Sequence, residues 1–253
     1  MSLLRGAFNR LLLGANTLLA FALMAPPALL KLLVPADGVR TGRDRVLNRL
    51  AGGWVAVNNA WIAGACPVPW QIRGIEGLNP RGWYLVSSNH QSWVDILVLQ
   101  RSFHGRIPFL KFFLKRELIW VRVPTAVINF VEGTRFTAAK HAAQSSSYRH
   151  LLEPRSGGLG VALATMGEQF EAMLDVTIVY PEGTPSFWTL LCGRMGAVTV
   201  DVRQRAIPPH LLGGDPSGDK ARRQHIRKWI EAQWKDKDRL IRGLLAAHRG
   251  ARR

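Results

Sequence analysis

A chain of 253 residues with 47% hydrophobic residues can bury one large core or two small ones. Its 34 basic and 17 acidic residues give a formal net charge of +17, which predicts an anionic partner: a substrate, a membrane surface or a nucleic acid. Two cysteines, Cys66 and Cys192, exclude a disulfide framework and a cysteine-based metal site, and the sequence has no phosphate-binding loop, nucleophile elbow or dinucleotide fingerprint.

Residues 11–30 form an uncharged segment of 20 positions, which is just long enough to cross the hydrocarbon core of a bilayer as a helix. Pro26 and Pro27 are expected to kink or end that helix near its last turns. A membrane-spanning or half-inserted anchor is favoured. A signal peptide lacks a convincing cleavage site here, and a buried soluble helix is hard to reconcile with a segment that is apolar on all sides.

More basic residues follow this segment than precede it. Arg5 and Arg10 precede it, and Lys31, Arg40, Arg43, Arg45 and Arg49 come after it. Because basic residues that flank a membrane helix tend to lie on the cytoplasmic side, we expect the rest of the chain to lie on that side. Residues 51–70 are also uncharged and place Trp54, Val57 and Trp61 on one helical face. This second helix can pack on the first, lie among lipid head groups, or pack in a soluble core.

The central feature is a histidine at the end of a predicted strand. The apolar run from Trp83 to Val86 predicts a buried strand, and Asp95 begins a predicted helix over residues 95–100. His90 lies at the turn between them, with Ser92 as a helix cap. If Asp95 reaches back from the first helical turns, its carboxylate can orient the imidazole, and His90 can act as a general base.

A second apolar strand, Val127–Val131, ends in Glu132-Gly-Thr-Arg135. Gly133 permits a tight turn and close approach to a ligand, and Arg135 offers a planar fork that suits phosphate oxygens. Glu132 is expected to anchor that arginine or neighbouring donors. Because parallel strands end at one edge of a sheet, this motif should lie near His90.

Asn89-His-Gln-Ser-Trp-Val-Asp95 followed by Phe130-Val-Glu-Gly-Thr-Arg135 resembles the glycerophospholipid acyltransferase family, the PlsC-like 1-acylglycerol-3-phosphate acyltransferases. The flanking sequence looks most like the lysocardiolipin-acyltransferase-like branch and its bacterial inner-membrane relatives. The resemblance implies that His90 and Asp95 are catalytic, and that Glu132, Gly133, Thr134 and Arg135 bind the phosphate of the acceptor. Lys140 and Arg155 are weaker candidates for phosphate contacts, and each can equally be a solvated charge.

The resemblance is interrupted in the middle of the chain. Lys115-Arg-Glu-Leu118 resembles the start of the family's second motif, but the chain then passes through Pro124 directly into the Val127–Val131 strand. The distance from His90 to Glu132 is therefore much shorter than the family leads us to expect. Two arrangements are then open: the Val127–Val131 strand lies directly beside the others, with fewer walls around the acceptor, or a groove is left where the missing segment would lie.

Residues 158–173 predict a helix, followed by a strand over Val176–Pro181 and another over residues 197–203. The first of these strands resembles the family's fourth motif, which implies that Tyr180 and Pro181 line the acyl-donor cleft; packing alone explains them equally well. The segment from Lys220 predicts a basic amphipathic helix, packed on the domain or in contact with anionic lipid.

Together these features predict an α/β fold with a mostly parallel sheet flanked by helices and an N-terminal membrane helix or hairpin. The expected division is a membrane anchor over 1–35, a connecting helical segment over 36–70, an acyltransferase domain over 71–215 and a C-terminal helix over 216–253. The resemblance implies acyl transfer from acyl-CoA or acyl-carrier protein to a lysophospholipid such as lysophosphatidic acid, without cofactor or metal, at the inner membrane. The alternatives are a catalytically impaired lipid-binding relative and a membrane-anchored nucleic-acid binder, for which no known module is visible.

Overall fold

The computed structural model describes residues 2–33, 37–112, 124–214 and 219–251. Its centre is a six-stranded sheet in the order β1-β6-β5-β2-β4-β3. The strands are β1 (Trp70–Arg73), β2 (Tyr84–Ser88), β3 (Leu110–Phe112), β4 (Ala126–Phe130), β5 (Ala172–Val179) and β6 (Val198–Arg205). All neighbouring strands run parallel except β5 and β6, so the predicted mostly parallel α/β fold is confirmed.

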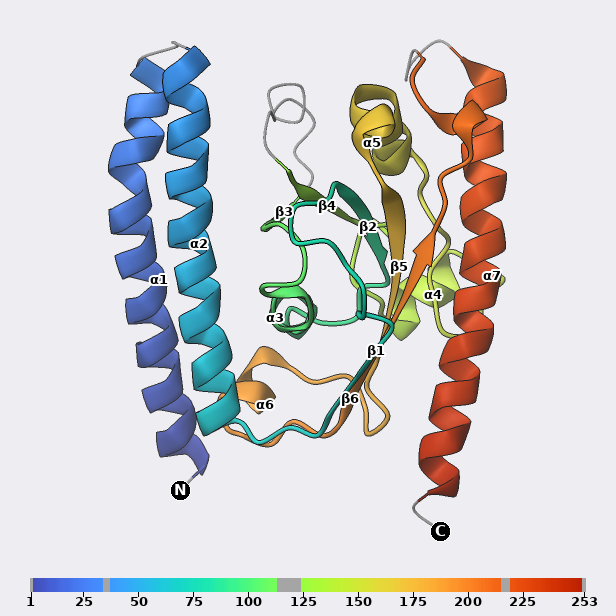
Figure 1. The fold of residues 1–253 in the computed structure, drawn as a ribbon. Coiled ribbons are helices and arrows are strands. Elements are labelled where there is room, and N and C mark those ends of the chain that lie inside the picture. The colour runs from blue at the N-terminus through green and yellow to red at the C-terminus, as the bar shows by residue number, and fades with distance from the viewer. Residues whose placement is uncertain (1, 34–36, 113–123, 215–218, 252–253) are drawn as a thin grey trace.

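Helices cover both faces of this sheet (Figure 1). They are α1 (Ser2–Leu33), α2 (Asp37–Ala65), α3 (Val94–Phe103), α4 (Ala138–Ala143), α5 (Gly157–Met166), α6 (Phe187–Leu191) and α7 (Lys220–Gly250). Alternate residues of β2 point into two cores. Tyr84 and Val86 pack with α3 and the end of α2, whereas Leu85 packs with α5 and α7. Burial on both faces explains why the strand sequence is continuously apolar.

The sheet places His90 and the Glu132–Arg135 motif at the same edge. Strand β2 pairs in parallel with β4, and Ser88 is level with Phe130. The segments that follow both strands therefore emerge side by side. Of the two arrangements that the sequence left open for the strand before Glu132, the structure shows the one in which it lies directly beside the others. The Lys115–Leu118 motif lies outside the described residues, and the short edge strand β3 was not predicted.

The two N-terminal helices form an antiparallel pair beside the domain (Figure 1). Side-chain amides join them: Asn16 Nδ2 donates to Asn58 Oδ1 at 2.8 Å, and Trp61 Nε1 donates to Asn9 Oδ1 at 3.0 Å. The second helix therefore packs on the first, one of the arrangements that the sequence left open. Helix α1 continues through Pro26 and Pro27 to Leu33, so of the two predicted effects, a kink or an end, the prolines do not end the helix.

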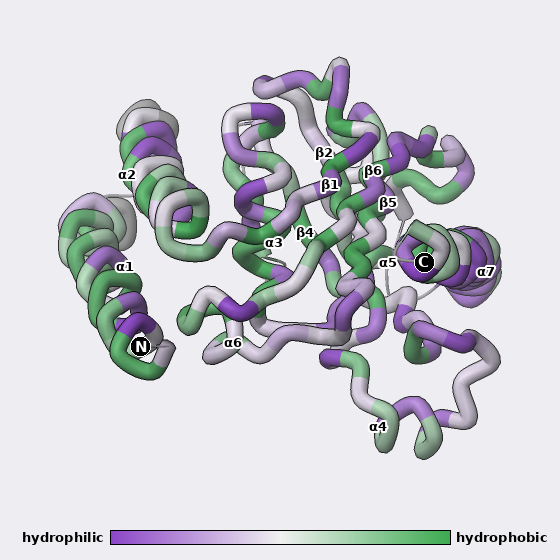
Figure 2. Tube along the Cα trace, turned by 90° about the horizontal axis from the view of Figure 1, so that it is seen from below, coloured by the Kyte–Doolittle hydropathy of each residue, from purple (hydrophilic) through white to green (hydrophobic). Residues whose placement is uncertain are grey.

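The long exposed side of α1 is apolar. Large side chains that remain exposed along it are Leu3, Leu4, Phe8, Leu11, Leu12, Leu18, Leu19, Phe21, Leu23, Leu29 and Leu30. Figure 2 shows α1 largely in the hydrophobic colour, in contrast to the outer side of α7. Among the described helices, α1 alone is long and apolar enough to cross a membrane, over Ser2–Leu30.

The helix predicted over residues 158–173 is shorter than expected. Helix α5 ends at Met166, a 3-10 turn spans Gly167–Gln169, and β5 already begins at Ala172. Ala172 and Met173 lie opposite Tyr84 and Leu85 of β2, so pairing with the central strand takes precedence over the local helical pattern. At the C-terminus, α7 packs Ile226, Ile230, Trp234 and Ile241 into the core, as its predicted apolar face requires.

Candidate active site

The turn that carries His90 is fixed to the sheet on both sides. The Asn89 side chain accepts the backbone N–H of Ile178 at 2.8 Å and donates to the carbonyl of the same residue at 2.9 Å. This double contact joins the end of β2 to β5, where no strand pairing remains. The His90 ring stacks on Phe130 of β4 with ring centroids 3.9 Å apart, so both its backbone and its ring are held.

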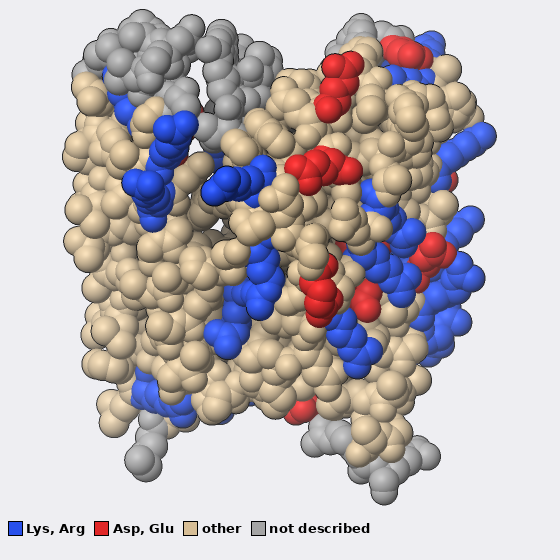
Figure 3. Space-filling model, viewed as in Figure 1, with Lys and Arg blue, Asp and Glu red and all other residues tan. Residues whose placement is uncertain are grey.

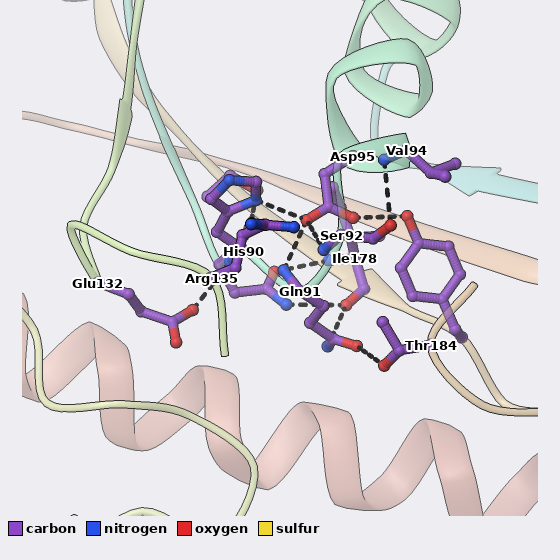
Figure 4. A network of polar contacts seen from close by, with 12 residues as sticks. His90, Gln91, Ser92, Val94, Asp95, Glu132, Arg135, Ile178 and Thr184 are labelled. Carbon is purple, nitrogen blue, oxygen red and sulfur yellow. Dashed lines mark hydrogen bonds and ion pairs between the residues drawn. The ribbon is translucent and has the colours of Figure 1, made fainter. Parts of the chain in front are cut away.

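The Asp95 carboxylate orients the imidazole (Figure 4). His90 Nδ1 lies 2.8 Å from Asp95 Oδ2, and the same oxygen accepts the backbone N–H groups of Gln91 at 2.6 Å and Ser92 at 2.9 Å. Asp95 is in the first turn of α3, near the positive end of the helix dipole. A carboxylate at this position makes Nδ1 the protonated nitrogen, so Nε2 is the basic atom of the ring.

Tyr180 completes the set of donors around Asp95. Its hydroxyl donates to Asp95 Oδ1 at 2.5 Å, and the side chain is buried directly after β5. Burial, followed by the nearby Asp95 charge, raises the pKa of Tyr180 well above its usual value, so the phenol stays a donor. Tyr180 therefore supports the carboxylate. Pro181, which was paired with it in the prediction of an acyl-donor cleft, is half-buried in the loop that follows.

Glu132 joins the Glu132–Arg135 motif to the His90–Asp95 motif. Its carboxylate accepts the backbone N–H of His90 at 2.8 Å and that of Leu152 at 3.1 Å. Glu132 is fully buried, and this burial raises its pKa from 4.5 to about 7, against the opposing effect of the two hydrogen bonds. Of the two roles suggested by the sequence, Glu132 fulfils the second: it holds neighbouring backbone donors.

Two cations, Arg135 and Lys140, lie at the surface beside the turn that carries His90. The Arg135 guanidinium lies 4.7 Å above the centre of the Trp93 ring, a cation–π contact between the two motifs. Lys140 Nζ donates to Thr134 Oγ1 at 2.6 Å and to the carbonyl of Arg135 at 3.3 Å. The φ angle of Gly133 is +67°, which favours glycine.

Arg155 reaches the same turn from another part of the chain. A Cβ atom on Gly133 would stand 3.0 Å from Arg155 Cδ, so the arginine stem lies directly over the glycine. Its backbone N–H donates to the carbonyl of Val131 at 2.7 Å. Arg135, Lys140 and Arg155 thus gather around one exposed turn, an arrangement suited to an anion with several oxygens.

Beneath this turn lies a buried ion cluster that the sequence did not indicate. Lys237 of α7 is 1% exposed, and its Nζ lies 2.8 Å from Asp175 Oδ1 and contacts the carbonyl of Val176. Arg205 Nε lies 2.9 Å from Asp175 Oδ2. Burial lowers the pKa of Lys237, and Asp175 and then Glu132 oppose that shift. The sequence signal that could have indicated this burial is the helical spacing, which puts Lys237 on the same face of α7 as Ile230, Trp234 and Ile241.

Trp93 and Phe130 were also missed as site residues, since an aromatic residue in a sequence carries no signal that separates a site contact from packing. Among the described residues, no group of three histidine, cysteine or carboxylate side chains is placed to bind a metal ion. The site therefore consists of a buried His–Asp–Tyr chain ending at His90 Nε2 and a set of surface cations beside it. Such a site combines a general base with an anion-binding turn.

The family model described as Acyltransferase matches residues 70–203, slightly more than half of the chain. The chain belongs to this Acyltransferase family. The match spans all six strands except the last residues of β6, and it includes both motifs of the site.

Three curated proteins are similar to parts of the chain. The 1-acyl-sn-glycerol-3-phosphate acyltransferase 2 of Arabidopsis thaliana is 31% identical over 163 residues, which cover 60% of this chain and 39% of the relative. The epsilon form of that acyltransferase from Mus musculus is 27% identical over 139 residues, covering 47% of this chain and 35% of the relative. Lysocardiolipin acyltransferase 1 of Danio rerio is 25% identical over 132 residues, covering 48% of this chain and 32% of the relative. The chain thus aligns with about two fifths or less of each relative.

Among solved structures, the chain is similar to the 1-acyl-sn-glycerophosphate acyltransferase PlsC from Thermotoga maritima. The superposition covers 92% of this chain and 98% of that chain, with 16% sequence identity and a TM-score of 0.47.

Proposed function

We propose that this chain transfers a fatty acyl group from a thioester, acyl-CoA or acyl-carrier protein, to the free hydroxyl of a lysophospholipid such as lysophosphatidic acid. The observation that carries the proposal is the His90–Asp95 contact beside the Arg135 turn. A general base next to an anion-binding turn is what a phosphorylated alcohol requires as an acceptor. The names of the curated relatives, which are lysophospholipid acyltransferases, support the same substrate class.

In the proposed reaction, His90 Nε2 removes the proton from the acceptor hydroxyl as its oxygen attacks the thioester carbonyl. Asp95 stabilises the imidazolium that forms, and Tyr180 and the two N–H donors hold Asp95 in place. When the carbonyl re-forms, the C–S bond breaks and the imidazolium returns its proton to the leaving thiolate. No covalent acyl-enzyme is involved, because the attack on the thioester is direct.

The acceptor phosphate is held by Arg135, with Lys140 and Arg155 contributing positive charge. Gly133 and Thr134 form the turn between these cations. Holding the phosphate fixes the hydroxyl relative to His90, and such positioning can contribute several kcal/mol, about 7–11 at best. The three cations are exposed, so we expect weak, poorly selective head-group binding, as the shortened middle of the sequence also suggested.

We place the reaction at a membrane, with α1 as the anchor and the domain on the cytoplasmic face of an inner membrane. The apolar exposed side of α1 supports contact with lipid. Helix α7 lies on the opposite side of the sheet (Figure 1), so its basic outer face lies away from this anchor. This location would supply the lysophospholipid from the bilayer itself.

The test is acyl transfer by the purified chain with radiolabelled acyl-CoA and lysophosphatidic acid. His90→Ala should lower kcat by about 10²–10⁴-fold, the usual contribution of a general base. His225→Ala is the matched control, because His225 is exposed on α7. Transfer by the His90→Ala protein at the wild-type rate would exclude the mechanism. A wild-type protein that binds lysophosphatidic acid but transfers nothing would instead identify a catalytically impaired lipid-binding relative.

A further inference from the structure

A cavity of about 630 Å³ lies between α2 and the domain, at the end of the sheet opposite to His90. His90 follows the carboxyl end of β2, whereas the cavity is lined by Arg81, which precedes β2, and by Pro124, which precedes β4. The remaining walls come from α2 and from the end of α3. The cavity is therefore separate from the candidate active site, and its volume is within the range of ligand sites.

The inner wall of this cavity is apolar. Its large side chains are Val55 of α2 and Phe103, Ile107, Phe109 and Leu110 of the segment around the end of α3. Val55 and Phe103 belong to the buried core, so this wall is continuous with a packed interior. An acyl chain is the kind of group that such a surface accommodates.

The rim of the same cavity is cationic. Arg45 and Arg49 line it from α2, and Arg81 and His104 line it from the domain; all four are exposed. Among the described lining residues none is acidic, and none of the three arginine side chains has an ion pair within the described part of the chain. Figure 3 shows a hollow between the two-helix side and the domain, with Lys and Arg side chains around it.

One buried polar atom is left without a partner at this site. Gln100 lines the cavity and is 7% exposed, yet its Oε1 has no hydrogen bond within the described residues. A buried amide oxygen without a donor is costly. That oxygen is closed off from the cavity, so the ligand is indicated by the apolar wall and the arginine rim, which suit an acyl chain and an anionic phosphate.

We propose that this cavity binds one anionic glycerophospholipid. The phosphate lies at the Arg45–Arg49–Arg81 rim, where planar guanidinium groups suit its oxygens, and one acyl chain lies along the apolar wall. The lipid would join α2 to the domain as a structural ligand distinct from the acceptor.

Two neighbouring glycines of α2 provide a matched pair of variants. Gly52 lines the cavity and Gly53 does not, and a Cβ atom at either position meets nothing within 4 Å. Gly52→Trp should therefore fill the cavity, and Gly53→Trp should place the same indole on another side of the helix. A third variant, Arg45→Gln/Arg49→Gln/Arg81→Gln, removes the rim charge without adding bulk.

Lipid binding to the full chain is measured by native mass spectrometry from nonionic detergent micelles that contain phosphatidylglycerol or phosphatidylcholine with identical chains. We expect one bound phosphatidylglycerol and weaker binding of phosphatidylcholine. Affinity should fall about tenfold in Gly52→Trp, should fall roughly 100-fold in the triple arginine variant, and should be unchanged in Gly53→Trp. Thermal unfolding by circular dichroism identifies any variant that does not fold. If Gly52→Trp does not fold, the triple arginine variant alone tests the proposal.

The proposal is overturned if the triple arginine variant keeps wild-type affinity, or if both glycine variants lose the lipid equally. Equal binding of the two phospholipids would exclude an anion-selective rim. Binding of millimolar inorganic phosphate without any binding of phosphatidylglycerol would identify a phosphate site and exclude a lipid site. Acyl transfer is not a readout here, so failure of this proposal is distinguishable from failure of the proposed reaction.

Discussion

Glu132 at the end of β4 accepts the backbone N–H of His90 at 2.8 Å, so the acid of one motif holds the main chain of the other. Its second oxygen accepts the N–H of Leu152 at 3.1 Å. Both partners are donors, and an ionised carboxylate is the acceptor that suits two donors at once. The charge of Glu132 therefore serves the geometry of His90, although burial opposes that charge.

This conflict predicts a specific dependence of stability on pH. The folded-state pKa of Glu132 is raised from 4.5 to about 7. A raised pKa means that the native state binds the proton more tightly than the unfolded state. The associated stability is fully present below pH 4.5 and is lost as pH rises through about 7. Relative to Glu132→Gln, the wild-type free energy of unfolding should fall by about 3 kcal/mol across this window.

Urea unfolding of both proteins over this pH range is the measurement. Subtracting the Glu132→Gln profile removes the titration of the other groups, and His90→Ala provides a control for the neighbouring histidine. Two parallel profiles would mean that Glu132 does not titrate in this range.

Tyr180→Phe tests whether the phenol supports Asp95. The change removes the 2.5 Å donor to Asp95 Oδ1 and keeps the buried ring. We expect kcat to fall about tenfold, because a less firmly held carboxylate orients and stabilises the imidazolium less well. Tyr84→Phe is the matched control, since the Tyr84 hydroxyl is also hydrogen-bonded, to the Asn79 N–H, but at the far end of β2. Equal losses in both variants would indicate a general effect of a missing buried hydroxyl.

The sequence predicted the strands before His90 and Glu132 because each is an apolar run with a polar ending. It also predicted that both motifs share one sheet edge, and the β2–β4 pairing places them there. It predicted that Glu132 anchors Arg135 or neighbouring donors, but it could not say which donors, because backbone N–H groups carry no sequence signal. The burial of Lys237 could not be predicted, because a lysine is rarely buried unless it is paired, and its partner Asp175 is distant in the sequence.

Arg135→Lys tests the proposed phosphate contact. Lysine keeps the charge but loses the planar fork and the stacking on Trp93. We expect KM for lysophosphatidic acid to rise about tenfold with a smaller change in kcat, the pattern of lost binding shared by ground and transition states. Arg149→Lys, at an exposed arginine, is the control. An unchanged KM would remove Arg135 from the acceptor site.

Two glutamates on α1 test the proposed membrane contact. Leu11 and Leu18 are each 73% exposed, so Leu11→Glu/Leu18→Glu disturbs little packing while adding charge to the apolar side. We expect recovery with floated anionic vesicles to fall about tenfold, and more at high salt, where the attraction of the basic surface is screened. Ala142→Glu/Ala143→Glu on exposed α4 adds the same charge elsewhere. If this control is released equally, net charge governs binding and α1 is not the anchor.

The buried ion cluster predicts unequal penalties for removing its two central partners. Asp175 contacts both Lys237, at 2.8 Å, and Arg205, at 2.9 Å, so Lys237→Met leaves the carboxylate with one cation. Asp175→Asn instead leaves the buried Lys237 without a carboxylate in contact. We expect Asp175→Asn to cost about 3–5 kcal/mol and Lys237→Met about 1–3 kcal/mol in the free energy of unfolding.

The double variant Asp175→Asn/Lys237→Met should recover part of the larger loss, because no unpaired ammonium then remains. The pKa of Lys237 is already lowered by burial, and losing Asp175 removes the main effect that opposes this shift. The Asp175→Asn protein should therefore regain stability as pH rises, since the unfolded state then holds the extra proton. Urea unfolding of the three proteins at neutral and alkaline pH tests both expectations. Equal single-variant penalties with no pH dependence would show that Arg205, and not Lys237, is the principal partner of Asp175.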